Sequence, residues 1–230
     1  MDIRANSPYS SRRSAVLAGN VVATSQPLAA QAGLTMLARG GNAVDAAIAT
    51  AITLTLVEPS GNGLGSDAFA IVWDGKELHG LNASGRSPAA WTPARFAKYD
   101  QMPFRGWETV TVPGAVSGWV AMSERFGKLP FADLFIPAIG YAEEGFIVTP
   151  VIAKLWQRAA EELGDYPGFA ETFLPDGKAP TAGSRYVNKD FAKTLRLIAE
   201  TKGEAFYRGV LADAICDFAA AHDAALTRED

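Results

Sequence analysis

Apolar and polar residues follow each other along most of the chain with a helical period. In residues 27–41 ("PLAAQAGLTMLARGG") apolar side chains recur three and four positions apart, which is typical of an amphipathic helix. Proline suits the first turn of a helix, and Gly40-Gly41 suits a left-handed cap at its carboxyl end. We therefore predict a helix that begins at about Pro27 and ends before Gly40.

A second helix of different character is predicted directly after these glycines. Asn42 is a suitable amino-terminal cap, and Asp45 lies in the first turn, where its charge favours the positive end of the helix dipole. Residues from Val44 to Val57 are apolar nearly all round, which indicates burial on several sides. The stretch is shorter than the roughly 20 apolar residues that cross a bilayer, so we expect no membrane span.

The pattern changes to strands near Phe69. Residues 67–84 ("DAFAIVWDGKELHGLNAS") contain two β-leaning runs around Asp74-Gly75, which predicts a hairpin with a tight turn. A third short strand is predicted at 108–112, and residues 166–186, rich in Pro and Gly, are interpreted as an irregular connection. Helical spacing returns in the segments 113–127, 129–145, 150–164, 188–203 and 204–222. Together these elements predict an α+β fold without internal repeats.

Composition and charge narrow the class of protein. The chain has 230 residues, of which 48% are hydrophobic and 20% charged, as in soluble globular proteins. Its net charge is -4 and no basic stretch is longer than Ser11–Ser14, so we expect no nucleic-acid partner. The amino terminus carries polar and charged residues where a secretory signal requires an apolar run, so we expect a cytoplasmic location.

Few residues suggest metal or cysteine chemistry. The single cysteine, Cys216, lies among helically spaced apolar residues, which favours a buried core thiol over a nucleophile. His79 and His222 are far apart in sequence, and neither has ligand-type residues at the spacing of a zinc site. We expect no metal, no cofactor and no Ser-His-Asp triad.

The glycine cluster in residues 59–69 ("PSGNGLGSDAF") does not fit a nucleotide loop. It follows a helix and leads into a strand, the reverse of a dinucleotide fingerprint, and it contains no Walker lysine. Two interpretations stay open: a tight turn from helix to strand, or the wall of an active site where glycines let the backbone approach a ligand.

Several segments in one order resemble the large-subunit region of the γ-glutamyltransferase (γ-glutamyltranspeptidase) family. They are residues 21–75, beginning "VVATSQPLAAQAGL", then "LNASGRSPAA", then residues 112–146, beginning "VPGAVSGWV", and finally "AALTRED". The resemblance runs from about Val21 to the last residue. Together with the missing export signal, it looks most like the cytoplasmic γ-glutamyltransferase-like branch.

The resemblance implies an αββα N-terminal-nucleophile hydrolase, made as a precursor that cuts itself. In that family the new amino-terminal threonine of the small subunit attacks the γ-glutamyl amide and passes the acyl group to water or an amine. A free α-amine, with a pKa of roughly 7.7–8.0, can activate such a hydroxyl near neutral pH. No threonine of this chain lies in the Thr-Thr-His-type sequence of the cleavage point. Residues 1–230 are then a single incomplete domain, a partial large subunit without a catalytic residue, whose partner is its own carboxy-terminal small subunit.

Two residues are candidates for the site. Arg86 matches the arginine of the family's "GRE-x-AP", which grips the α-carboxylate of the γ-glutamyl group; from the residues alone it would be a solvated loop arginine. The family's "G-I-G-G-G-x-F" is here "GLGSDAF", and the acidic residue after the arginine is here Ser87. Asp67 either lines the site or caps the turn.

These departures leave the substrate open. The first hypothesis is γ-glutamyl transfer or hydrolysis. The second is a cephalosporin-acylase-like amidase that acts on a glutaryl side chain, and the third is a non-catalytic scaffold that lacks the nucleophile.

Overall fold

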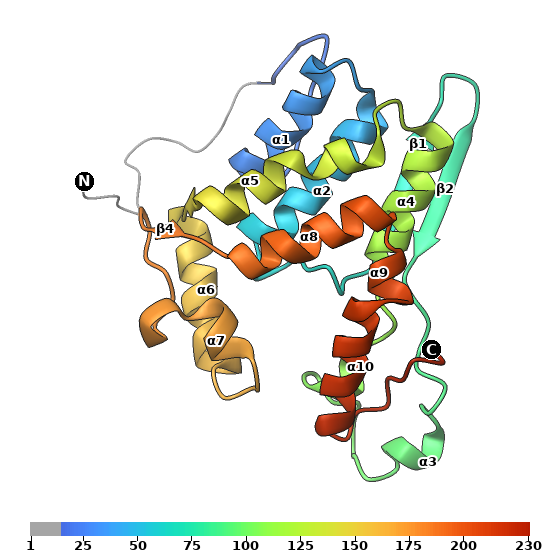
Figure 1. Cartoon of the computed structure of the whole chain (residues 1–230), viewed down its shortest axis with the longest axis vertical. Coiled ribbons are helices and arrows are strands. Elements are labelled where there is room, and N and C mark those ends of the chain that lie inside the picture. The colour runs from blue at the N-terminus through green and yellow to red at the C-terminus, as the bar shows by residue number, and fades with distance from the viewer. Residues whose placement is uncertain (1–14) are drawn as a thin grey trace. The chain divides into compact units, whose positions relative to one another are not determined.

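The computed structural model describes residues 15–230 and confirms the α+β class (Figure 1). Of the described residues 51% are helical, and the strands among them form two small antiparallel sheets of two strands each. Ser11–Ser14 and most of the segment on which the export prediction depends lie outside the described residues. None of the helices in residues 15–230 has the length and apolar character that crossing a membrane requires.

Most of the elements are helices, with one β-hairpin and a second pair of short strands that are far apart in the sequence. The α-helices are α1 (Pro27–Ala38), α2 (Ala43–Val57), α3 (Pro93–Phe96), α4 (Ala115–Phe126), α5 (Ile136–Glu144), α6 (Pro150–Leu163), α7 (Phe169–Phe173), α8 (Lys189–Thr201), α9 (Glu204–Tyr207) and α10 (Val210–Ala221). The strands are β1 (Ala68–Trp73), β2 (Leu78–Ala83), β3 (Phe146–Ile147) and β4 (Arg185–Tyr186), and the 3-10 helices are η1 (Trp107–Thr109), η2 (Phe131–Phe135) and η3 (Pro175–Gly177).

The chain divides into two compact units. The first contains the residues up to Gly63 and those from Lys128 to Leu195; the second contains Leu64–Gly127 and Arg196–Asp230. Each unit is therefore built from two separate stretches of the sequence.

In the first unit, α1 ends as its sequence predicts. Gly40 adopts a positive φ of 89°, its N–H donates to the Leu37 carbonyl at 3.1 Å, and the Gly41 N–H donates to the Met36 carbonyl at 2.9 Å. These paired bonds form a Schellman motif, which satisfies carbonyls that the helix itself leaves unpaired. The predicted left-handed cap is confirmed.

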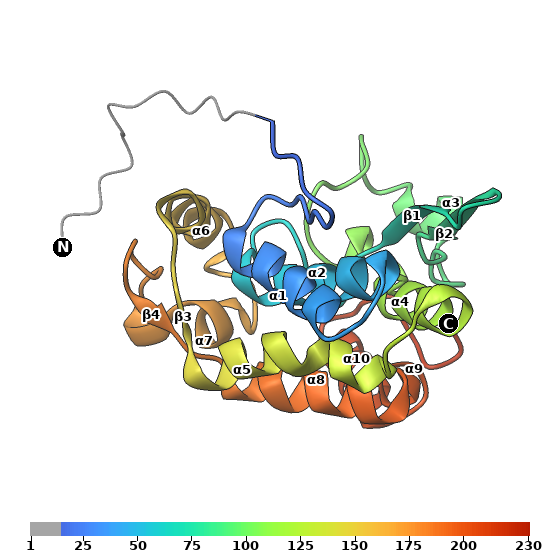
Figure 2. The ribbon, with the colours of Figure 1, turned by 90° about the horizontal axis from the view of Figure 1, so that it is seen from above.

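Helix α2 is the most enclosed element of the first unit. It packs against α1, η2 and α5, and Figure 2 shows α1 running alongside it. Ten of its fifteen residues are buried, which confirms the prediction from its apolar sequence. Its amino end carries a capping box, in which the Asn42 side chain accepts hydrogen bonds from the Val44 and Asp45 N–H groups while Asp45 reaches back to the Asn42 N–H.

Asp45 also has a long-range role that its sequence position does not reveal. Its carboxylate is fully buried and accepts hydrogen bonds from the backbone N–H groups of Asn42 at 2.8 Å, Lys128 at 3.1 Å and Leu129 at 3.3 Å. A buried charge is tolerated when several donors surround it. Asp45 therefore ties the start of α2 to the distant segment 128–129.

We predict that Asp45→Ala lowers the free energy of unfolding by about 2–3 kcal/mol, because it leaves buried backbone donors without an acceptor. Asp133→Ala is a matched control, since Asp133 forms a partly exposed ion pair with Arg39 at 2.9 Å, and such pairs contribute about 1 kcal/mol or less. Urea unfolding of both variants beside the parent measures the difference. Equal losses for the two variants would contradict the assigned role.

Aromatic side chains organise the rest of the first unit. Trp156 of α6 donates its indole N–H to the Phe173 carbonyl at 2.9 Å, and the Tyr186 hydroxyl donates to the Thr172 carbonyl at 2.6 Å. Both rings belong to the buried apolar cluster of this unit. These bonds order α7 within 166–186, so the segment predicted to be an irregular connection also contains a short helix.

The second unit contains the predicted hairpin. β1 and β2 pair antiparallel from Ala68↔Ala83 to Trp73↔Leu78, and Gly75 in the turn has a φ of 96°. One face of the hairpin packs on α4, where Gly118 brings the helix close to Ala83. The opposite face exposes Phe69, Ile71, Trp73 and Leu78.

The third strand predicted at 108–112 is wrong. Residues 107–109 form η1, and Val112 donates its N–H to the Arg86 carbonyl at 2.9 Å without a ladder forming in the described residues. Pro113 follows and has no N–H, so pairing cannot continue along this segment.

Candidate active site

Arg86 lies in a loop, residues 84–89, whose backbone is tightly held. Gly85 has a φ of 67°, and any side chain there would collide with the Val112 carbonyl. Glycine is therefore required for both the conformation and the close approach. The Val112 N–H donates to the Arg86 carbonyl and fixes the next residue as well. We call residues 84–89 the Arg86 loop.

The Arg86 guanidinium is oriented by a backbone oxygen. Its Nε and Nη2 donate to the Asp230 main-chain oxygen at 3.0 and 2.6 Å. A guanidinium has five N–H donors, so roughly three remain after these two. Nη1 and the second N–H of Nη2 form the end of the fork, and this edge can bind a carboxylate in a bidentate manner.

Asp230 closes a turn beside this loop. Its Oδ1 accepts the Ala89 N–H at 2.6 Å, and its Oδ2 accepts the N–H and hydroxyl of Thr227 at 2.8 and 3.1 Å. Partial burial by itself would raise the pKa of Asp230, but the hydrogen bonds from Ala89 and Thr227 outweigh it and lower the pKa below its ordinary value. The carboxylate is therefore ionised at neutral pH. We call residues 227–230 the 227–230 turn.

A cavity of about 520 Å³ lies beside Arg86 in the second unit, with walls from α4, α9, α10 and the 227–230 turn. Its other cations are neutralised by neighbouring carboxylates: Lys202 pairs with Glu124, Arg208 with Glu204, and Arg228 with Asp213. Arg86 differs from them in its contacts: it interacts electrostatically with the Asp230 carboxylate, and the end edge of its guanidinium has no hydrogen-bond partner within residues 15–230.

Tyr207 fixes the wall that this cavity shares with a second one of about 410 Å³. Its hydroxyl donates to the Pro113 carbonyl and accepts the Ser117 N–H, both at 2.9 Å. Gly114 offers no side-chain cap to α4, so Tyr207 satisfies one of the free N–H groups of that helix. Burial raises the pKa of Tyr207, which keeps the phenol neutral.

Cys216 does not lie in the core, contrary to its sequence interpretation. It is only half-buried and lines the larger cavity, because α10 fully buries little more than Ala219. Burial raises the pKa of the thiol. At neutral pH the thiol is protonated and a weak nucleophile.

Asp67 is exposed immediately before β1. Its carboxylate makes no hydrogen bond within the described part of the chain, and it is not among the residues around the two cavities that contain Arg86. The backbone next to it has a clearer role, since the Ser66 carbonyl accepts the N–H groups of Gly114 and Ala115 at the start of α4. A role for Asp67 in lining a site stays a prediction.

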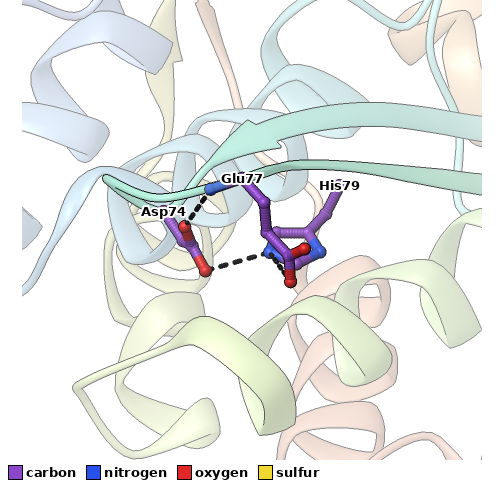
Figure 3. A group of neighbouring side chains, drawn as sticks. All are labelled: Asp74, Glu77 and His79. Atoms are coloured by element: carbon purple, nitrogen blue, oxygen red, sulfur yellow. Dashed lines mark hydrogen bonds and ion pairs between the residues drawn. The ribbon is translucent and has the colours of Figure 1, made fainter.

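The hairpin turn brings together three ligand-type residues that the spacing along the sequence did not suggest. Asp74, Glu77 and His79 lie close to one another at the end of the hairpin (Figure 3). Asp74 Oδ1 accepts the N–H groups of Lys76 and Glu77 at 2.8 and 2.9 Å, and Asp74 Oδ2 lies 3.0 Å from His79 Nε2. The bonds from Glu77, His79 and Lys76 lower the pKa of Asp74 to about 2.

The contacts of His79 indicate its tautomer. Arg125 Nη2 lies 3.0 Å from His79 Nδ1, and arginine can only donate, so Nδ1 is the acceptor. Nε2 then carries the proton and donates it to Asp74, whereas a metal ligand needs a lone pair there. The three residues and Arg125 thus form a hydrogen-bonded network that fastens the hairpin turn to α4.

Comparison with known proteins identifies the family. The family model described as "Gamma-glutamyltranspeptidase" matches residues 29–230. The chain is 40% identical over 191 residues to the "Glutathione hydrolase-like YwrD proenzyme" of Bacillus subtilis, covering 82% of this chain and 36% of that protein. It is 37% identical over 226 residues to the "Acylase ACY 1 proenzyme" of Pseudomonas sp. (strain SE83), covering 91% of this chain and 40% of that protein.

A solved structure agrees with these sequence matches. The cephalosporin acylase from Bacillus halodurans superposes with a TM-score of 0.90 and 48% identity over 100% of this chain and 45% of that one. The chain thus spans less than half of the length of each of these three proteins. The predicted family and its large-subunit region are confirmed: the chain belongs to the γ-glutamyltranspeptidase family.

Proposed function

We propose that this chain is the large-subunit part of a self-processing γ-glutamyltransferase or hydrolase. The complete enzyme transfers a γ-glutamyl group from an amide to water or an amine through a threonine acyl-enzyme. The nucleophile belongs to a carboxy-terminal small subunit, which is the partner of this chain, and residues 1–230 form one incomplete domain. We further propose a cytoplasmic location and a role for Asp67 at the edge of the site.

The observation that carries this proposal is the state of Arg86. Its side edge is fixed on the main-chain oxygen of Asp230, and its end edge retains N–H donors that have no partner among residues 15–230. It also lies at a cavity of about 520 Å³. A planar guanidinium held in this way suits an acyl group that ends in a carboxylate.

A second candidate uses the same residue. A glutaryl side chain also ends in a carboxylate, and the proteins named as acylases are among the relatives of this chain. A cephalosporin-acylase-like glutaryl amidase is therefore the alternative. Arg86 serves both, so the choice depends on groups that recognise the α-amine of a γ-glutamyl group.

The test compares a γ-glutamyl anilide with a glutaryl anilide on two proteins, the full-length precursor and the 230-residue chain alone. We expect the precursor to cleave itself into two chains and to release aniline product, with the preferred donor deciding between the two candidates. The chain alone should release none, because it lacks the nucleophile. Turnover by the 230-residue chain would refute the proposal that the nucleophile belongs to the small subunit. A precursor that stays intact and inactive would favour a non-catalytic scaffold.

A further inference from the structure

One residue joins the 227–230 turn to the Arg86 loop. The Asp230 carboxylate accepts from Thr227 within the turn and from the Ala89 N–H in the loop, the latter at 2.6 Å. The main-chain oxygen of the same residue receives Nε and Nη2 of Arg86. Asp230 therefore holds both the loop that carries the arginine and one edge of its guanidinium.

The side chain and the main chain of Asp230 have separate partners. The carboxylate oxygens accept from N–H groups and a hydroxyl, and the main-chain oxygen accepts from the guanidinium. The Asp230 carboxylate also lies close enough to interact electrostatically with Arg86. Both contacts from the guanidinium use its side edge, so the end edge keeps N–H donors for another anion.

We propose that Asp230 is a positioning residue which, with Thr227, presents the end edge of Arg86 to the carboxylate of the acyl donor. This inference rests on the proposed function of Arg86. Asp230 itself touches no reacting atom. Its effect on the reaction passes through the Arg86 loop, because holding a long side chain in one rotamer before binding removes part of the entropy cost of gripping the ligand.

The first test measures the contact directly, without activity. Asp230→Asn keeps the size of the side chain but removes its charge and one acceptor. Asp165→Asn makes the same change at an exposed residue outside the cavities and is the matched control. In the full-length precursor we expect hydrogen exchange of the Ala89 amide, resolved by NMR, to be about tenfold faster in Asp230→Asn and unchanged in Asp165→Asn. Unchanged exchange in Asp230→Asn would overturn the proposal.

The second test measures coupling to Arg86 in the full-length precursor. We expect Asp230→Asn to raise KM for the acyl donor about tenfold with a smaller change in kcat, and to cost no further activity, within about twofold, in an Arg86→Ala background. An equal loss in both backgrounds, or the same loss in Asp165→Asn, would show that Asp230 acts independently of Arg86. If the parent accepts no carboxylate-bearing donor, the proposed function fails, while the Ala89 exchange still decides whether Asp230 holds the loop.

Discussion

Replacing Arg86 by alanine in the full-length precursor should lower kcat/KM for the acyl donor by about 30- to 1000-fold. This corresponds to on the order of 2–4 kcal/mol of lost transition-state binding, the scale for truncating one side of a desolvated, hydrogen-bonded charge pair. Self-cleavage should proceed as in the parent, because it involves no substrate carboxylate. Steady-state kinetics and the appearance of two chains on a gel measure the two effects separately.

Arg86→Lys and Arg158→Ala complete this experiment. Lysine keeps the charge but cannot reproduce the bidentate fork or the side-edge contact with the Asp230 oxygen, so we expect it to be impaired as well. Arg158 is an exposed arginine on α6, and its removal should leave the kinetics unchanged. Parent-like kinetics in both Arg86 variants would place the carboxylate clamp elsewhere.

The exposed face of the hairpin should govern assembly with the rest of the protein. Phe69 and Trp73 of β1 are 70% and 64% exposed, and Leu78 lies opposite Trp73 on the same outward face. Large apolar side chains on a sheet with free edges favour contact with a further layer or strand. We expect the 230-residue chain alone to bind a hydrophobic dye or aggregate, and the carboxy-terminal part supplied in trans to suppress both.

The double variant Phe69→Ser/Trp73→Ser identifies the surface involved. Fully burying each side chain contributes about 1.5–3 kcal/mol, so losing two should weaken association with the carboxy-terminal part by about 3–6 kcal/mol, which is on the order of 100-fold or more. The isolated variant should bind less dye than its parent. Val151→Ser on α6, which is also strongly exposed, is the control and should change neither property. A monodisperse, dye-silent parent with a cooperative melt would contradict this account and favour an independent scaffold.

Local signals in the sequence predicted most of the fold. Asn42, Gly40 and the Asp74-Gly75 turn each act within a few residues, so their roles as caps and turn were predictable and are confirmed. The predictions that are wrong depend on contacts between residues far apart in the sequence. The segment 108–112 has the composition of a strand, but none of the strands in residues 15–230 pairs with it, and Pro113 ends the pairing.

The site was less predictable because its bonds join distant parts of the sequence. Arg86 was identified through a family resemblance, whereas its contact with Asp230 spans 144 residues and has no periodic signal. A weaker signal was present, since Thr227 and Asp230 have the spacing of a side-chain-capped turn. Asp45 was recognised only as a first-turn acid, although it binds a segment more than 80 residues away.

The most direct test of Arg86 as the substrate clamp changes the substrate carboxylate and the arginine together. The measurement is the ratio of kcat/KM for the preferred anilide donor to that for its neutral carboxamide analogue, taken for the parent precursor and for Arg86→Ala. We expect a preference of about 30-fold or more for the carboxylate in the parent and its near-complete loss in the variant, because the two changes remove the same interaction. A parent without this preference, or a variant that retains it, would contradict the assignment of Arg86 as the substrate clamp.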